Sequence, residues 1–148
     1  MPADNKSIVR RLYDEVWNNR RLEVADEIIA ASHAVHDNHL PDSAIGPEAY
    51  KRNVTRWVAG FPDLRFTVED MVAENDKVVA YWVISGTHKG EYRGIPATNK
   101  KISVDGITIN HVAAGRIMDS IVNYDALGMM QQLGVVPRLG KSKRAVAR

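Results

Sequence analysis

Hydrophobic residues in the first part of the chain recur every three or four positions, which is the period of an α-helix. The pattern predicts three helices, over residues 5–17, 22–31 and 46–61. The third begins with Gly46 and Pro47, and proline is favoured at the first helical position because its missing N–H would have no partner there. Residues 32–45 are mostly polar and are predicted to form a loop that contains His33, His36 and His39.

From residue 64 onward the hydrophobic period changes to two, which is typical of strands. Four strands are predicted, over residues 64–72, 77–88, 101–112 and 116–124. A closing helix over residues 125–133 has Asp125 as its N-cap. Helices followed by an antiparallel meander predict an α+β fold, in which the helices pack on one face of a sheet.

The last two predicted strands are apolar on both faces. One face carries Ile107, Ile109, Ile117 and Ile121, and the other carries Val104, Val112, Val122 and Tyr124. The helices can cover only one of these faces, and a second copy of the chain is the simplest cover for the other. The sequence therefore predicts a homodimer that forms through the sheet.

The turn between these two strands sets their register. A three-residue turn over residues 113–115 would pair Val112 with Arg116 and place Thr108 opposite Ser120. The small side chains of Thr108 and Ser120 would then leave space above the sheet, either for a ligand or for the packing of a helix.

Length and composition limit the possible classes of protein. A chain of 148 residues predicts a single domain, here residues 1–135, followed by a basic and solvated tail over residues 136–148. The net charge is only +2, and the tail has no aromatic residues, so binding to nucleic acid is not expected. The absence of cysteine excludes disulfides, thiolate catalysis and cysteine-bound zinc. No hydrophobic run can span a membrane and no signal peptide is visible, which favours a cytoplasmic protein.

Six short motifs occur in an order that resembles the SnoaL-like polyketide cyclases, also called ester cyclases. They are residues 8–13 (IVRRLY), 46–50 (GPEAY), 61–68 (FPDLRFTV), 86–90 (GTHKG), 94–96 (GIP) and 125–134 (DALGMMQQLG). The resemblance implies the fold named after nuclear transport factor two, a cone of three to four helices against a strongly curved antiparallel or mixed sheet. It also implies a deep apolar cavity and an intramolecular aldol ring closure that uses neither metal nor cofactor.

The same resemblance places the family's acid/base aspartate at Val122 and its assisting histidine at Thr108. One carboxyl group in an apolar cleft could remove a proton from a carbon between two carbonyls and return it to the aldol oxygen. Neither valine nor threonine can do this near neutral pH. No Asp or Glu is expected at an inward position in the middle of a strand, which also argues against epoxide hydrolysis or keto-steroid isomerisation.

Two histidines remain as candidates for acid/base catalysis. His88 lies in the GTHKG motif and could reach the mouth of the cavity, or it could bond a loop carbonyl in a structural role. His36 lies near Asp37 and His39, where a polar lid is a simpler interpretation than a metal site because no third ligand is clear. No metal and no cofactor are therefore predicted.

The residues predicted to line the cavity are Tyr13, Trp17, Asn53, Trp57, Trp82, Thr108 and Val122, although the aromatic ones could equally serve as core. Two functions remain open. The first is a cofactor-free enzyme that acts by cyclase-like acid/base chemistry on a small apolar molecule with carbonyl groups. The second is a protein that binds such a molecule without converting it.

Overall fold

The computed structural model describes residues 4–37 and 45–138. Its helical segments are α1 (Asn5–Arg11), the π-helical η1 (Leu12–Asn18), the 3-10 turn η2 (Leu22–Val24), α2 (Ala25–Ile28), α3 (Gly46–Gly60) and α4 (Ala126–Leu133). Its strands are β1 (Ile29–Asp37), β2 (Arg65–Glu74), β3 (Lys77–Thr87), β4 (Lys101–Ala113) and β5 (Arg116–Tyr124). Within the described ranges, no helix has the length and hydrophobicity needed to cross a membrane.

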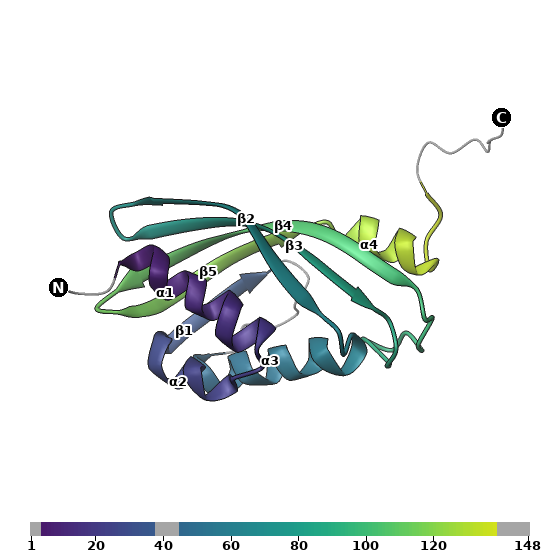
Figure 1. Ribbon diagram of the computed structural model, residues 1–148, viewed down its shortest axis with the longest axis horizontal. Helices are drawn as coiled ribbons and strands as arrows, with labels where there is room; N and C mark the ends of the chain where they lie inside the picture. The colour runs from purple at the N-terminus through teal and green to yellow at the C-terminus, as the bar shows by residue number, and fades with distance from the viewer. Residues whose placement is uncertain (1–3, 38–44, 139–148) are drawn as a thin grey trace.

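The five strands form one sheet in the order β1-β5-β4-β3-β2. All neighbours are antiparallel except β1 and β5, which are parallel, so the sheet is mixed. The sheet is strongly curved, and α1, α2 and α3 lie on its concave side (Figure 1). The α+β class and the curved sheet predicted from the sequence are therefore confirmed.

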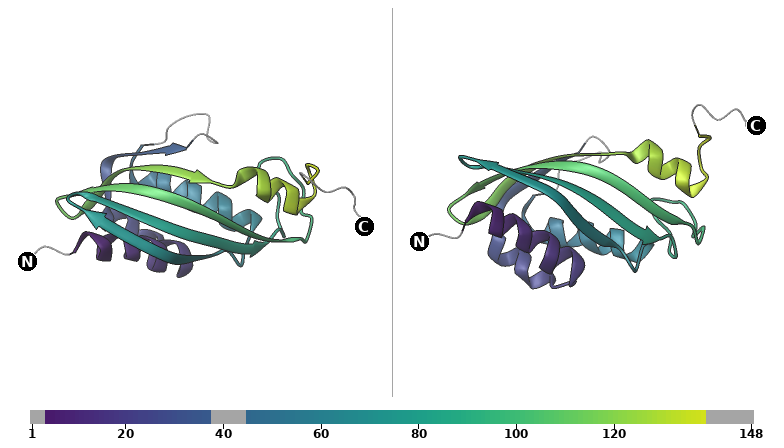
Figure 2. Two further views of the ribbon diagram at one scale, coloured as in Figure 1. Left: turned by 90° about the horizontal axis from the view of Figure 1, so that it is seen from above. Right: turned by 45° about the horizontal axis from the view of Figure 1, so that its top comes forward.

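Strand β1 is the main departure from the predicted elements. The expected second helix ends at Ile28, and the expected loop begins instead as a strand that continues to Asp37. This strand lies at the edge of the sheet beside β5 (Figure 2). Its hydrogen-bond partners are far along the chain, so its local polarity gave no sign of the pairing. The rest of the expected loop, with His39, falls mostly outside the described residues.

The predicted register between β4 and β5 was wrong by one position next to the turn and by two positions farther along the strands. The strands are joined by a two-residue turn, Ala114 and Gly115, in which both φ angles are positive (52° and 76°), as a tight hairpin turn of this length requires. Met118 then forms a bulge, because His111 pairs with Asp119 whereas the next residue of β4 pairs with Ile117. The bulge turns Ile117 toward the helices, where it is fully buried.

The hydrophobic core fills the space between the sheet and the helices. The helical rod of α1 and η1 contributes Ile8, Val9, Leu12 and Val16, which lie on one side because they recur at helical spacing. Burial of each such aliphatic side chain contributes about 1.5–3 kcal/mol. The core therefore holds the rod firmly on the concave side of the sheet.

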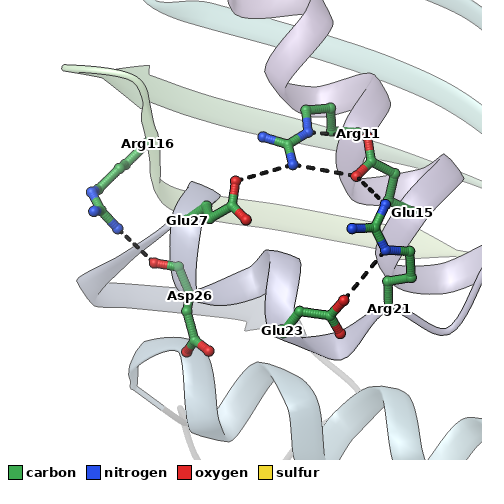
Figure 3. Close-up of polar contacts among 7 residues, drawn as sticks. All are labelled: Arg11, Glu15, Arg21, Glu23, Asp26, Glu27 and Arg116. Atoms are coloured by element: carbon green, nitrogen blue, oxygen red, sulfur yellow. Dashed lines mark hydrogen bonds and ion pairs between the residues drawn. The ribbon is translucent and has the colours of Figure 1, made fainter.

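Charged side chains join the helical segments on their solvent side (Figure 3). Arg11 forms ion pairs with Glu15 at 3.1 Å and with Glu27 at 3.2 Å, and Arg116 of β5 donates to the backbone oxygen of Asp26 at 2.9 Å. Ion pairs that are this exposed contribute little individually, typically about 0.2–1 kcal/mol. They orient the helices on a fold that the core already stabilises.

The closing helix α4 begins as predicted. The carboxylate of Asp125 accepts from the backbone N–H of Gly128 at 2.8 Å, which makes it the N-cap. The amide of Gln132 bonds both the N–H and the carbonyl of Ser103, at 2.7 Å and 3.0 Å, and so covers the part of β4 that extends beyond β5. Most of the predicted basic tail lies outside the described residues.

Candidate functional site

A cavity lies between the helices and the concave face of the sheet. It holds about 70 Å³ of space for the centres of water-sized molecules, several times the roughly 10–15 Å³ that one buried water needs. We call it the central cavity. Its walls are formed by Leu12, Tyr13, Trp17, Val35, Asp37, Tyr50, Asn53, Trp57, Phe66, Trp82, Ile84, Thr108, Asn110, Ser120, Val122 and Tyr124.

All seven residues predicted as ligand contacts lie on this wall. Thr108 and Val122 are also direct partners across β4 and β5, so the two positions at which the sequence resemblance places an acid/base pair are neighbours here. Strand alternation turns both side chains to the concave face, with Asn110 and Ser120 forming the next inward pair. The error in the predicted register had hidden this second pair.

The indole of Trp82 is held across the floor of the cavity. Its Nε1 donates to the hydroxyl of Thr108 at 2.9 Å, and its ring lies over Gly106. A Cβ at position 106 would approach the ring atoms Cη2 and Cζ2 to 2.4 Å and 2.6 Å, which is much too close for carbon atoms. Only glycine at this position leaves room for the observed orientation of the indole.

A chain of buried hydrogen bonds connects β1, β5 and β4. The ring nitrogen Nε2 of His33 lies 3.2 Å from Oγ of Ser120, and that hydroxyl donates to Oδ1 of Asn110 at 2.9 Å. Because the Ser120 hydroxyl donates its proton to Asn110, Nε2 of His33 must be the protonated ring nitrogen, and it donates to the Ser120 oxygen. Burial lowers the pKa of His33 to about 4, so its ring is neutral at physiological pH.

Tyr13 on η1 places a phenol at the end of this chain. Burial raises the pKa of Tyr13 to about 12, and hydrogen bonds with Thr108 and Asn110 oppose that rise. The Thr108 oxygen accepts from Trp82, which leaves the Thr108 proton available for the phenol oxygen. Asn110 has a second amide proton besides the one it donates to the Val78 carbonyl. Thr108 and Asn110 thus each have a proton that the phenol oxygen of Tyr13 can accept, which would leave the Tyr13 O–H for a ligand.

Aromatic residues form much of the remaining wall. The indole Nε1 of Trp17 donates to the hydroxyl of Tyr50 at 2.8 Å. At the other end, the ring of Trp57 packs 4.8 Å from the ring of Tyr92 and 6.0 Å from that of Tyr124, measured between centroids. Asn53 is half-buried on α3, and its carbonyl oxygen accepts from Arg56 at 3.4 Å.

A carboxylate does reach the central cavity, contrary to the expectation from the sequence. Asp37, the last residue of β1, lies on the wall and is the direct partner of Val122 across the parallel pair β1 and β5. Burial raises the pKa of Tyr92 and of Tyr124, and the negative charge of Asp37 adds to both effects. The carboxylate therefore lies close to the aromatic end of the cavity. Sequence reasoning missed it because residues 32–45 were interpreted as a loop.

The two histidines predicted as catalytic lie elsewhere. His36 is exposed and pairs with Ile121, whose side chain is on the convex face of the sheet. His88 is fully buried against Phe61, and its Nδ1 accepts from the backbone N–H of Thr98 at 3.2 Å, so it supports the loop after β3. Its Nε2 has no hydrogen-bond partner within the described part of the chain. Neither histidine lies on the wall of the central cavity.

A metal ion has no evident set of ligands in the part of the chain that the structure describes. No three side chains of His, Asp or Glu in these ranges gather closely enough to hold one. Of the residues considered for a metal from the sequence, His36 and Asp37 point to opposite faces of the sheet, and His39 falls outside the described residues.

Comparison with known proteins identifies the family. The profile of the SnoaL-like polyketide cyclases matches residues 7–133, which is most of the chain. The chain belongs to the SnoaL-like polyketide cyclase family. The resemblance inferred from the six sequence motifs is thereby confirmed.

Individual SnoaL-like relatives match over nearly their whole length. The aklanonic acid methyl ester cyclase DnrD of Streptomyces peucetius is 30% identical over 135 residues, which cover 86% of this chain and 88% of DnrD. A proposed polyketide cyclase of Acidithiobacillus ferrooxidans is 31% identical with a TM-score of 0.80. The match covers 90% of this chain and 96% of the Acidithiobacillus chain. IdmH of Streptomyces antibioticus, also a proposed polyketide cyclase, is 29% identical with a TM-score of 0.78. The match covers 89% of this chain and 99% of the IdmH chain.

Proposed function

We propose that this protein binds a small, mostly apolar molecule with carbonyl groups in its central cavity and closes a ring in it by a cofactor-free intramolecular aldol reaction. The observation that carries the proposal is the phenol of Tyr13, which is buried in a largely aromatic cavity beside the hydroxyl of Thr108 and the amide of Asn110. The family and the name of DnrD agree with this class of substrate.

The lining of the cavity suits such a ligand. Most of the wall is aromatic or aliphatic, which favours a flat apolar molecule, and a few hydroxyl and amide groups can fix its orientation. The O–H of Tyr13 is well placed to donate to a carbonyl oxygen. Because negative charge grows on that oxygen when the neighbouring carbon loses a proton, the hydrogen bond would strengthen in the transition state.

Binding can be tested without knowing the natural ligand. Native mass spectrometry of protein purified without denaturant would reveal a retained molecule. The methyl ester of a tetralone β-keto acid serves as a defined probe, since Trp17, Trp57 and Trp82 all line the cavity and report binding by fluorescence. We expect Tyr13→Phe to weaken binding of this probe about fivefold, as the loss of one neutral hydrogen bond of about 1 kcal/mol predicts.

The matched control is Tyr81→Phe, which removes a phenol from the convex face of the sheet, where Tyr81 bonds Asp105. Equal affinities for Tyr13→Phe and Tyr81→Phe would contradict the assignment of the cavity. Incubation with aklanonic acid methyl ester, the molecule in the name of DnrD, tests ring closure directly. A cyclised product separated by chromatography would support the enzymatic part of the proposal.

A binding protein without catalysis is the second candidate. It is favoured by Val122 and Thr108, which stand where the resemblance expects an acid/base pair and which are neighbours in the structure. In that case the probe would bind with the same dependence on Tyr13, but no proton would be exchanged and no ring would close.

We also propose that the protein is a homodimer that pairs through the convex face of its sheet. This face exposes Val72, Tyr81, Ile107 and Ile121, each with more than a third of its surface accessible. We expect Ile107→Lys to shift the sedimentation coefficient from that of a dimer to that of a monomer. Leu127→Lys, which changes an exposed apolar residue on α4, should leave it unchanged.

A further inference from the structure

The pairing of β1 with β5 places a carboxylate next to the position that lacks one. Asp37 and Val122 are partners across these two parallel strands, and paired residues in a sheet project to the same face. Neighbouring strands lie about 4.8 Å apart, so a side chain on one can reach the space above the other. Both residues lie on the wall of the central cavity.

We propose that Asp37 is the general base of this protein, and that it supplies from β1 the carboxylate that the family resemblance places at position 122 of β5. The inference rests on the proposed function, because it assigns a residue to the proton transfer that an aldol ring closure requires.

The composition of the wall supports this assignment by elimination. Among the described residues that line the cavity, Asp37 is the only one with a carboxyl group, and none is a histidine, lysine or arginine. Burial raises the pKa of the cavity phenols Tyr13, Tyr50 and Tyr124, so none of them can act as a base near neutral pH. His33 is separated from the cavity by Ser120, to which its Nε2 is bonded.

The location of Asp37 is also suitable for the chemistry. It lies at the end of a strand, half-buried, near the aromatic residues Trp57, Tyr92 and Tyr124. A flat substrate packed on these rings would present one edge to the β1 and β5 wall. Tyr13, on the helical side of the same cavity, would then bond an oxygen of the substrate while the carboxylate faces the adjacent carbon.

The proposed step conserves atoms and charge. The Asp37 carboxylate takes the proton from a carbon between two carbonyls, and the electron pair of the broken C–H bond forms an enolate whose oxygen accepts a hydrogen bond from Tyr13. The enolate carbon attacks a second carbonyl carbon of the same molecule, which forms the C–C bond and leaves an alkoxide. Asp37, now a carboxylic acid, returns its proton to that alkoxide. The product is an isomer of the substrate.

The test follows proton exchange at carbon with the tetralone β-keto ester as the probe. Nuclear magnetic resonance measures the incorporation of deuterium from heavy water at the carbon between the two carbonyls. We expect the native protein to accelerate this exchange and Asp37→Asn to lower the rate at least about 100-fold, the lower end of what a positioned base contributes. Binding of the probe, read from tryptophan fluorescence, should change by no more than a few fold.

Three further variants make the assignment specific. In the double variant Asp37→Asn with Val122→Asp, the carboxylate returns to β5, and we expect a substantial part of the lost exchange rate to be recovered. Asp14→Asn removes the same charge from an exposed position on η1, away from the cavity wall, and should exchange like the native protein. Should the double variant fail to fold, Asp37→Glu, which keeps the carboxylate on β1, should retain much more activity than Asp37→Asn.

The outcomes separate this inference from the proposed function. If the native protein and Asp37→Asn exchange equally fast, the assignment of Asp37 is wrong, whereas the proposed function still stands on another base. If the native protein binds the probe but does not accelerate exchange at all, both the catalytic function and the role of Asp37 are overturned, and the binding function remains.

Discussion

Glycine at position 106 is the clearest point at which one methyl group should disturb the cavity. In Gly106→Ala the new Cβ would lie 2.4 Å and 2.6 Å from atoms of the Trp82 ring and 2.8 Å from Cβ of Tyr124. Carbon atoms normally approach no closer than about 3.5 Å, so the indole has to move by roughly 1 Å. That movement would break its 2.9 Å hydrogen bond to Thr108.

The cost follows from these contacts. Overpacking of a core typically costs about 1–3 kcal/mol, and the lost hydrogen bond adds about 1 kcal/mol. Replacement of glycine by alanine inside a strand returns about 0.5–1 kcal/mol, because the unfolded chain loses conformational freedom. We therefore expect a net destabilisation of about 2 kcal/mol, which corresponds to a decrease of roughly 4–8 °C in Tm for a domain of this size.

A double-mutant cycle with Trp82→Phe tests the mechanism, with unfolding in urea followed by circular dichroism. The phenyl ring is shorter than the indole and lacks the atoms that would clash, so Gly106→Ala should cost at least 1 kcal/mol less in the Trp82→Phe background, a coupling typical of residues in contact. The same cost in both backgrounds would refute the reasoning, since the damage would then come from Tyr124 or from the backbone.

Two other predictions concern stability. Because burial lowers the pKa of His33 to about 4 in the folded state, from 6.5 in the unfolded chain, the stabilisation is present above pH 6.5 and is lost as the pH falls toward 4. We therefore expect His33 to lower the free energy of unfolding by about 2 kcal/mol at pH 5 relative to pH 7. Urea unfolding should show that His33→Gln removes this pH dependence. His36→Gln, which changes an exposed neighbour, should retain it. Asn18→Ala should cost about 2 kcal/mol, because its amide bonds both backbone groups of Phe66, at 2.8 Å and 2.9 Å; a loss in Tm no larger than that of the exposed control Asn19→Ala would contradict this role.

Local patterns in the sequence predicted most of the fold. The first and third helices, the four strands of the meander and the cap at Asp125 all follow from hydrophobic period and capping chemistry, which depend on residues close together in the chain. The family resemblance correctly supplied the curvature of the sheet. All of the predicted ligand contacts reached one cavity, because they lay on elements whose inward faces could be identified by period.

Features that depend on distant contacts were not predicted. Strand β1 has few large hydrophobic residues, and its conformation is fixed by pairing with β5, so Asp37 and His33 were assigned to a loop. The bulge at Met118 depends on the conformation of a two-residue turn, and without it Asn110 and Ser120 were not recognised as partners. His88 was expected to reach the cavity because the GTHKG motif does not show whether the imidazole points to the cavity or to the following loop.

The parallel pairing of β1 with β5 also constrains how the protein is made. Asp37 and Val122 are 85 positions apart in the chain, so the strand that bears the aspartate can join the sheet only after β5 has left the ribosome. Contacts of such long sequence separation form slowly, because a long loop must close before any pairing energy is gained. A nascent chain that ends before residue 116 can already form the hairpin of β2 and β3, but it lacks β5, with which the strand that bears Asp37 pairs. Formation of the central cavity is thus among the last steps in the folding of a newly synthesised chain.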